Sequence, residues 1–488
     1  MADHQAAYPR PRRVFRVLQT ATLGLCALLL VPSSQAPAQE AAPSAAVETA
    51  AISGPNIVAA ELPLFNFGTL FRARDQARLD QFFATLDENW SDGYFAPLIE
   101  ISGFTSNRAS RDRIFAFLEE KSGERFGSDF QAWFQWLWKR DEAITADYAD
   151  FKSLIYRLID PRFEAYFAGR TGTARIRLDE IRWGGVVQDG IPPLRQPEML
   201  AADKADYLDD SNVVFGIEIN GDARAYPQRI LAWHEMFVDT IGGVEIAGVY
   251  CTLCGTVIPY RTNVDGTNHV MGTSGFLYRS NKLMYDLETQ SLWSTMRGEP
   301  VVGPLVDQGI KMEFEPVITT TWGEWKRRHP DTTVLSLNTG HSRDYGEGVA
   351  YRAYFATDDL MFNTPFEAEN LDNKQEVLGL RFPGAPQDQL AIDTAFLSDN
   401  PIYVDAVGFQ TVAVITDTSG ANRVYDPEDV TFVSFDGDRT LLDEAGQEWT
   451  LDEDHLTATD GRRLTRLPAH RSFWFGWHAA FPETRLVM

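Results

Sequence analysis

Cysteine is scarce in this sequence, because 488 residues contain only Cys26, Cys251 and Cys254. Cys26 falls in an N-terminal segment with the features of a removable export signal, so the mature chain keeps a single Cys-x-x-Cys pair. A metal site made of four cysteines is excluded, because no second pair exists. Any sulfur chemistry of the mature protein therefore depends on Cys251 and Cys254.

Long apolar runs and glycine-rich phosphate motifs are missing as well. After the N-terminal signal, no segment holds the roughly 20 consecutive apolar residues of a membrane-spanning helix, so we expect a soluble mature protein without a transmembrane segment. Neither a GxGxxG sequence nor a P-loop occurs, and no nucleotide cofactor is expected. The sequence also has no internal repeat.

Basic residues are few, with 44 lysines and arginines against 69 aspartates and glutamates. The formal charge of −25 becomes −28 once the signal is removed, because the signal carries four arginines and one aspartate. A chain this acidic repels nucleic acid and anionic lipid, so no nucleic-acid partner is expected. The charge is compatible with a cationic or metal partner, and equally with an ordinary solvated acidic surface. No other partner is predicted.

Residues 1–38 are predicted to form a signal peptide. An apolar run over Val17–Val31 follows a basic stretch, and Ala36-Pro37-Ala38 supplies the small residues of a cleavage site. The basic stretch contains Arg10, Arg12, Arg13 and Arg16. Arg12-Arg13-Val14-Phe15 also resembles a twin-arginine export signal, with an ordinary Sec signal as the alternative. Both routes predict a periplasmic or secreted protein.

The predicted fold class is α+β, with an N-terminal helical domain followed by a β-rich core domain with short helices. Residues 39–58 are rich in Ala, Pro and Ser and are predicted to form a flexible leader. Residues 59–170 show helical periodicity, and two stretches each place four or five apolar side chains on one face. These stretches are Leu79, Phe82, Phe83 and Leu86, and then Phe130, Trp133, Phe134, Leu137 and Trp138.

Short β-branched runs separated by Gly, Asn and Asp predict strands after residue 170. We expect a core domain over 171–365 and a C-terminal β-rich extension over 366–488 that packs on it. Val213–Ile219 and Ala223–Tyr226 are predicted to form a hairpin, and Val244–Tyr250 and Thr256–Arg261 are predicted strands on either side of the cysteines. A helix is expected over Trp322–His329, with Thr320 or Thr321 as its N-cap.

The Cys-x-x-Cys pair has three possible chemistries. A thioredoxin-type dithiol needs the first cysteine at a helix N-terminus, whereas a strand pattern with an early proline follows Cys254. A metal knuckle fits better, since Gly255 allows the backbone to turn after the second cysteine. Copper or zinc bound by Cys251, Cys254 and His234 is the first hypothesis. A structural disulfide is the third possibility, although so short a ring stabilises little.

A reactive thiol is the second functional hypothesis. Cys251 would be the nucleophile, with His234 as its base and Glu235 orienting the imidazole. His234 and Glu235 stand in an amphipathic run near the cysteines, where such a pair can also be purely structural. The third functional hypothesis is a non-catalytic binding module with aromatic-rich surfaces. Whether the protein is an enzyme stays open at this point.

An ordered set of short motifs is similar to the bacterial and archaeal family called domain of unknown function 3179. The resemblance covers about 175–355 and has a C-terminal echo near 473–484. It implies no established activity, and this sequence departs from the family pattern at Thr252 and Val238. The motifs are Asp179–Gly185, Asp189–Pro193, Gly221–Pro227, Trp233–Glu235, Tyr250–Cys254, Ser274-Gly275, Met284–Asp286, Ser291–Trp293, Thr339-Gly340 and Arg343–Tyr345.

Several side chains within or beside these motifs are candidates for substrate binding: Ser274, Asn281, Asp286, Trp293 and Arg343. The spacing of Asp286 with Thr289 and Ser291 is equally typical of a hairpin turn closed by side-chain hydrogen bonds.

Overall fold

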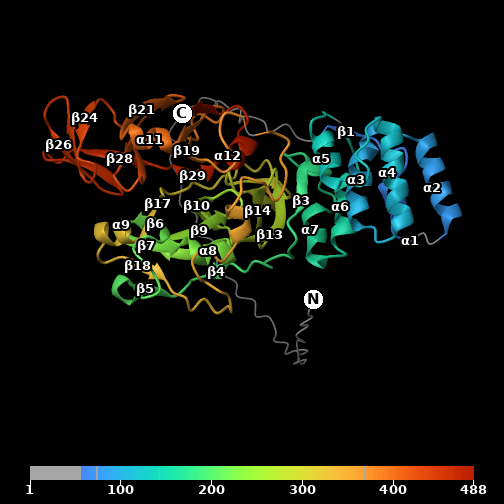
Figure 1. Cartoon of the computed structure of the whole chain (residues 1–488), viewed down its shortest axis with the longest axis horizontal. Coiled ribbons are helices and arrows are strands. Elements are labelled where there is room, and N and C mark those ends of the chain that lie inside the picture. Colours follow the sequence, from blue (N-terminus) through green and yellow to red (C-terminus); the bar gives the residue numbers. More distant parts are fainter. Residues whose placement is uncertain (1–55, 73–74, 142, 368) are drawn as a thin grey trace, which may run out of the picture. The chain divides into compact units, whose positions relative to one another are not determined.

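The computed structural model describes residues 56–72, 75–141, 143–367 and 369–488. The predicted signal peptide and nearly all of the predicted leader lie outside these residues. The described residues belong to one compact unit. The fold is a mixture of helices and strands with a large β-rich region (Figure 1). No helix among the described residues has the length and apolar character needed to cross a membrane.

Helices dominate the described chain up to residue 167, and the predicted apolar faces are buried except at Phe130, which is half-buried. Leu79, Phe82, Phe83 and Leu86 are the buried residues of α2, and α5 buries Trp133, Phe134, Leu137 and Trp138. The helices are α1 (Thr69–Arg72), α2 (Gln76–Glu88), α3 (Phe95–Phe104), α4 (Arg108–Ser122), α5 (Phe130–Trp138), α6 (Tyr148–Tyr156) and α7 (Glu164–Phe167). Asp75, Asn107 and Asp129 cap α2, α4 and α5 by accepting backbone N–H groups, which fixes where these helices begin.

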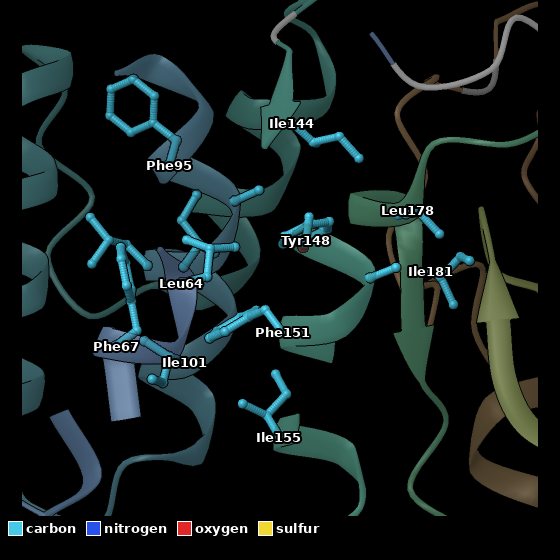
Figure 2. Packing of buried hydrophobic residues seen from close by; sticks show 14 of the residues in the cluster. Leu64, Phe67, Phe95, Ile101, Ile144, Tyr148, Phe151, Ile155, Leu178 and Ile181 are labelled. Atoms are coloured by element: carbon cyan, nitrogen blue, oxygen red, sulfur yellow. The ribbon is translucent and has the colours of Figure 1, made fainter. Parts of the chain in front are cut away.

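The helices share their apolar core with an antiparallel sheet. This sheet has the strand order β16-β15-β14-β13-β3. Its strands are β3 (Ile181–Trp183), β13 (Met271–Tyr278), β14 (Asn281–Asp286), β15 (Leu292–Ser294) and β16 (Glu299–Val302). Tyr148, Phe151 and Ile155 of α6 belong to one buried cluster with Leu178 and Ile181 (Figure 2). Phe276 of β13 is part of the same cluster. The apolar core therefore continues across the predicted domain boundary at residue 170.

Two further sheets carry the segment around the cysteines. One has the order β17-β6-β7-β18-β5, and the other has the order β10-β9-β8-β4. The predicted strands are confirmed, and β6 and β10 have the predicted bounds. The strands are β4 (Leu194–Arg195), β5 (Met199–Ala201), β6 (Val213–Ile219), β7 (Asp222–Pro227), β8 (Met236–Ile241), β9 (Val244–Cys251), β10 (Thr256–Arg261), β17 (Ile318–Thr321) and β18 (Thr333–Leu335).

Short helices connect these strands. Helix α8 (Gln228–His234) leads from β7 into β8. Helix α9 (Trp322–Arg328) follows β17, and the hydroxyl of Thr321 caps it by accepting from Glu324 N, as predicted. Among its described residues, the segment between β18 and residue 376 contains one helix, α10 (Arg352–Phe355). Two small two-stranded sheets pair β1 (Ile57–Val58) with β2 (Ile144–Thr145) and β11 (Asn263–Val264) with β12 (Thr267–Asn268).

The last part of the chain is rich in strands, as expected, and one of its sheets carries helix α12 against the cysteine hairpin. That sheet has the order β29-β19-β20-β30, and the eight-stranded sheet runs β21-β22-β23-β28-β27-β26-β25-β24. The elements of the first are β19 (Glu376–Arg381), β20 (Gln389–Asp393), α11 (Thr394–Asp399), β29 (His470–Phe473), α12 (Trp474–Ala480) and β30 (Arg485–Val487). The second contains β21 (Ile402–Val407), β22 (Gln410–Thr416), β23 (Asn422–Tyr425), β24 (Phe432–Phe435), β25 (Thr440–Asp443), β26 (Glu448–Leu451), β27 (His455–Ala458) and β28 (Arg463–Leu467).

Candidate functional site

The two cysteines lie in the tight turn between β9 and β10. Cys251 is the last residue of β9 and pairs with Thr256, the first residue of β10. Cys254 N donates to Cys251 O at 3.1 Å, and Gly255 has a φ of 61°, a value that favours glycine. The strand–turn–strand arrangement predicted for a knuckle is present. Its two sulfurs are joined in a disulfide, which is one of the three chemistries considered for the pair.

The two sulfurs have different surroundings. Cys251 lines a cavity and is 2% exposed, whereas Cys254 is fully buried. The Cys254 Sγ lies 3.1 Å from Asn281 Oδ1. Gly476 of α12 packs so closely that a Cβ there would lie 2.9 Å from the Cβ of Cys254. An incoming group can therefore reach Cys251 from the cavity, while Cys254 is held behind it.

The cavity beside Cys251 is small, about 60 Å³ in volume. Apolar side chains make up much of its wall, among them Phe276, Leu277 and Phe362. Met361, which is 50% exposed, lies on the solvent side of the wall. The space suits a group of the size of a cysteine side chain or a few small atoms, and it excludes a large planar cofactor.

A buried ion pair shares this cavity with Cys251. Lys282 Nζ lies 3.1 Å from Glu235 Oε2 and also donates to the Glu235 carbonyl oxygen at 3.1 Å. Lys282 is 5% exposed and Glu235 is 8% exposed. Burial lowers the pKa of Lys282 from 10.5, and the Glu235 carboxylate opposes that shift by stabilising the ammonium form. The pair therefore places a weakly solvated cation in the wall of the cavity that Cys251 also lines.

Two further polar groups of the cavity wall are the hydroxyls of Tyr351 and Thr252. Tyr351 donates to Glu235 Oε1 at 3.2 Å, and burial raises the pKa of Tyr351 above its ordinary value, which keeps it a neutral donor. Thr252 is buried, and its hydroxyl has no hydrogen-bond partner among the described residues. A buried hydroxyl without a partner costs free energy, and such a cost is typical of a group that a bound molecule would satisfy.

Glu235 has an unusual backbone for a glutamate. It ends α8 with φ 54° and ψ 0°, in the left-handed region where glycine is the usual residue. Its N–H donates to Leu231 O at 2.7 Å, and its carbonyl oxygen accepts from Tyr250 N at 2.9 Å. A residue with a side chain destabilises the folded state by about 1 kcal/mol or more in this region. The chain has a glutamate here although glycine would avoid this strain. Strain of this kind is common at functional sites.

Both ring nitrogens of His234 are engaged by groups other than the cysteines. Its Nδ1 lies 2.9 Å from Pro192 O, and its Nε2 lies 2.6 Å from the Tyr345 hydroxyl. The side chain does not line the cavity. Over the described ranges, no group of three or more His, Cys, Asp and Glu side chains is placed to hold a metal ion. The structure therefore does not assemble Cys251, Cys254 and His234 as one ligand set, whereas Glu235 does lie beside Cys251.

The candidate substrate-binding residues do not line this cavity. Asp286 accepts from Glu288 N and Thr289 N, which is the hairpin turn considered as the alternative. Ser274 is buried and donates to Leu283 O at 2.6 Å, and Trp293 is buried in an apolar cluster. Arg343 lines a separate surface cleft. Asn281 is the one candidate of this group that contacts the disulfide.

Lys282 and Tyr351 are site residues that sequence reasoning missed. Lys282 stands in β14, whose residues are all buried, so a lysine in a strand of this character was an available indication of a special role. Tyr351 follows the last of the quoted motifs and lies in a segment with little regular structure. Nothing in its neighbourhood along the chain predicts a contact with Glu235.

A comparison with protein families shows which family the chain that carries this site belongs to. A family model described as Protein of unknown function (DUF3179) matches residues 188–484. The chain belongs to this family. The match contains both cysteines, Glu235, Lys282 and Tyr351, and it extends through the C-terminal region that the sequence analysis treated as an extension. The helices before residue 170 precede the matched DUF3179 region. Comparisons with curated proteins and with solved structures give no match.

Acidification is expected to destabilise the protein through His234. Burial lowers its pKa from 6.5 to about 4, so the folded state holds this imidazole neutral. The resulting stabilisation is complete above pH 6.5 and is lost as the pH falls through 4, and it amounts to about 3 kcal/mol at most. His234→Gln should flatten the dependence of unfolding free energy on pH in this window. His455→Gln is the matched control, and an equal flattening in both variants would contradict the assignment.

Proposed function

We propose that the protein exchanges disulfides with thiols through Cys251 and Cys254 after export to an oxidising compartment. The observation that carries the proposal is the position of the disulfide, with one sulfur on a cavity that also holds a buried ion pair. A disulfide with only a structural role needs neither a cavity nor a charged partner. A ring this short would also contribute only about 2 kcal/mol by constraining the unfolded chain.

The proposed reaction is a two-electron exchange. A substrate thiolate enters the cavity and attacks Cys251 Sγ, so a mixed disulfide forms while the Cys251–Cys254 bond breaks and its electron pair leaves on Cys254. A second thiolate of the same substrate then attacks the substrate sulfur of the mixed disulfide and releases Cys251. The substrate dithiol becomes a disulfide; one of its two protons ends on Cys254, and the other is released to solvent while Cys251 stays a thiolate. The reverse sequence reduces a substrate disulfide.

The surrounding residues have distinct parts in this proposal. Asn281 Oδ1, 3.1 Å from Cys254 Sγ, would accept a hydrogen bond from the protonated Cys254 thiol and so stabilise the reduced state. The Lys282 ammonium, in the wall of the same cavity, would stabilise a Cys251 thiolate by its charge. Glu235 keeps Lys282 protonated, and Tyr351 holds the carboxylate in place. Lys282 and Glu235 thus replace His234 in the proposed thiol chemistry.

Trapping of a mixed disulfide tests the proposal. In a Cys26→Ser background, reduced Cys254→Ser protein is treated with bis(2-hydroxyethyl) disulfide, a small neutral probe, and intact mass is measured over time. We expect one stable adduct on Cys251, because no neighbouring thiol can resolve it. Cys251→Ser should stay unmodified, and the wild-type pair should return to its internal disulfide. Equal labelling of the two variants, or no labelling of native Cys254→Ser, would contradict the proposal.

Metal binding by the reduced cysteines is the competing proposal. It requires thiolates rather than a disulfide, and at least one further ligand brought from elsewhere in the fold. Reduced wild-type protein incubated with zinc or copper(I) distinguishes the two proposals. One bound metal ion per chain that is lost in Cys251→Ser would favour the metal site. Thiols that react at an unchanged rate in the presence of metal would favour disulfide exchange.

A further inference from the structure

A second cavity lies where the helices meet β3. Its volume is about 370 Å³, within the range of small-molecule binding sites. Its wall is mostly aromatic. The lining residues come from α3, α5, α6, the segment just after α6, and β3. The aromatic members are Phe104, Phe130, Phe134, Tyr156 and Trp183. None of these residues lines the cavity beside Cys251, so the two sites have separate walls.

Arg182 supplies the positive charge of this aromatic cavity. Its guanidinium carbon lies 3.9 Å from the ring centroid of Phe134 and 4.6 Å from that of Phe130. Within the described part of the chain, no hydrogen bond or ion pair engages the guanidinium group. Its nitrogens are not fully enclosed by protein atoms. Burial lowers the pKa of Arg182 from 12.5, which reflects the cost of holding this charge away from bulk water.

Glu100 lines the same cavity as Arg182, and the acidic groups near Arg182 are already engaged. Glu100 is 2% exposed and accepts from the Tyr148 hydroxyl at 2.7 Å, the Tyr156 hydroxyl at 2.6 Å and Lys152 Nζ at 2.5 Å. Lys152 therefore matches the charge of Glu100. The two acids just before β3 are bound by other arginines, Asp179 by Arg177 and Glu180 by Arg279. Arg182 is left as a cation without its own carboxylate.

A charged donor group on the wall of a largely aromatic cavity is suited to a ligand with two parts. The planar guanidinium can donate two parallel hydrogen bonds to a carboxylate, and the aromatic rings can cover an apolar chain or ring. A phosphate would bring more charge than one arginine offsets and would leave oxygens against apolar walls. We propose that this cavity binds a small carboxylate with an apolar body, such as a medium-chain fatty acid.

Calorimetric titration of the full chain with octanoate and with octan-1-ol tests this proposal. The two probes share the apolar chain and differ in the carboxylate, so their difference reports on Arg182. We expect octanoate to bind one site per chain and about tenfold or more tighter than octan-1-ol, because the charged hydrogen bonds form only with the carboxylate. Equal affinities, or no binding of octanoate at millimolar concentration, would overturn the proposal and leave Arg182 a structural cation on aromatic rings.

Arginine variants then locate the bound carboxylate. Arg182→Met should weaken octanoate about tenfold or more and leave octan-1-ol unchanged, whereas Arg182→Lys should retain part of the preference. Arg157→Met makes the same chemical change on an exposed arginine and should bind both probes as the wild type does. A preference for octanoate that survives in folded Arg182→Met would contradict the site. Should Arg182→Met fail to fold, as judged by circular dichroism, the comparison of the two probes on the wild-type chain still decides.

Discussion

Glu235→Ala is expected to lower the free energy of unfolding by about 3–5 kcal/mol, the usual cost of removing one partner of a buried ion pair. Lys282 would then stay 5% exposed without its carboxylate. Alanine keeps the strained backbone of Glu235, so the change isolates the side chain. Because burial lowers the pKa of Lys282, the loss should shrink as the pH rises toward 10.5 and the lysine becomes neutral. Urea unfolding at several pH values measures this effect.

The double variant Glu235→Ala with Lys282→Met is the control. It removes both charges and should recover most of the lost stability, since a buried pair replaced by apolar groups is often nearly neutral in stability. The wild-type pair would then be retained for the site rather than for folding. A loss below about 1 kcal/mol in Glu235→Ala, or a double variant no more stable than the single one, would show that the pair is solvated and not the buried cation proposed here.

Glu100→Ala, made in the wild-type chain, is also expected to lower the free energy of unfolding by about 3–5 kcal/mol. Glu100 holds Lys152, which is fully buried, together with two tyrosine hydroxyls. These groups lie in the apolar cluster that joins the helices to β13 and β14, so the whole cluster should melt at a lower temperature. Thermal unfolding followed by far-UV circular dichroism measures the expected fall in melting temperature.

Two comparisons make the Glu100 result specific. Glu100→Leu with Lys152→Met removes the charges together and should recover most of the stability. Glu164→Ala breaks an exposed pair with Arg157, whose side chains are 52% and 46% exposed, and should change stability by less than about 1 kcal/mol. A Glu100→Ala protein as stable as Glu164→Ala would contradict the buried position of the pair.

Periodicity along the chain predicted the local structure well. The bounds of β6 and β10 follow from runs of β-branched residues ended by turn residues, and the buried faces of α2 and α5 follow from the helical repeat. The turn after Asp286 was predicted from side chains that bond to their own backbone. Such features depend on residues close in sequence, and the sequence displays them directly.

The candidate site could be predicted only in part. His234 and Glu235 are neighbours, and the sequence does not tell which of them faces Cys251. The end of α8 decides this, because Glu235 takes a left-handed backbone and turns toward Lys282 while His234 bonds to Tyr345. Lys282 reaches the site through the pairing of β13 with β14. Contacts of this range depend on the packing of whole sheets, which local patterns do not contain.

The proposed exchange depends on the disulfide whose Cys251 lines the cavity of Lys282 and Glu235. The direct measurement is its reduction potential, obtained by equilibrating the native Cys26→Ser chain in glutathione buffers and counting free thiols. We expect one reversible two-electron transition between about −120 and −270 mV, the range of exchange-active pairs, because Asn281 and Lys282 would stabilise the reduced sulfurs. A potential below about −300 mV, or reduction that occurs only after unfolding, is typical of a structural disulfide and would contradict the claim.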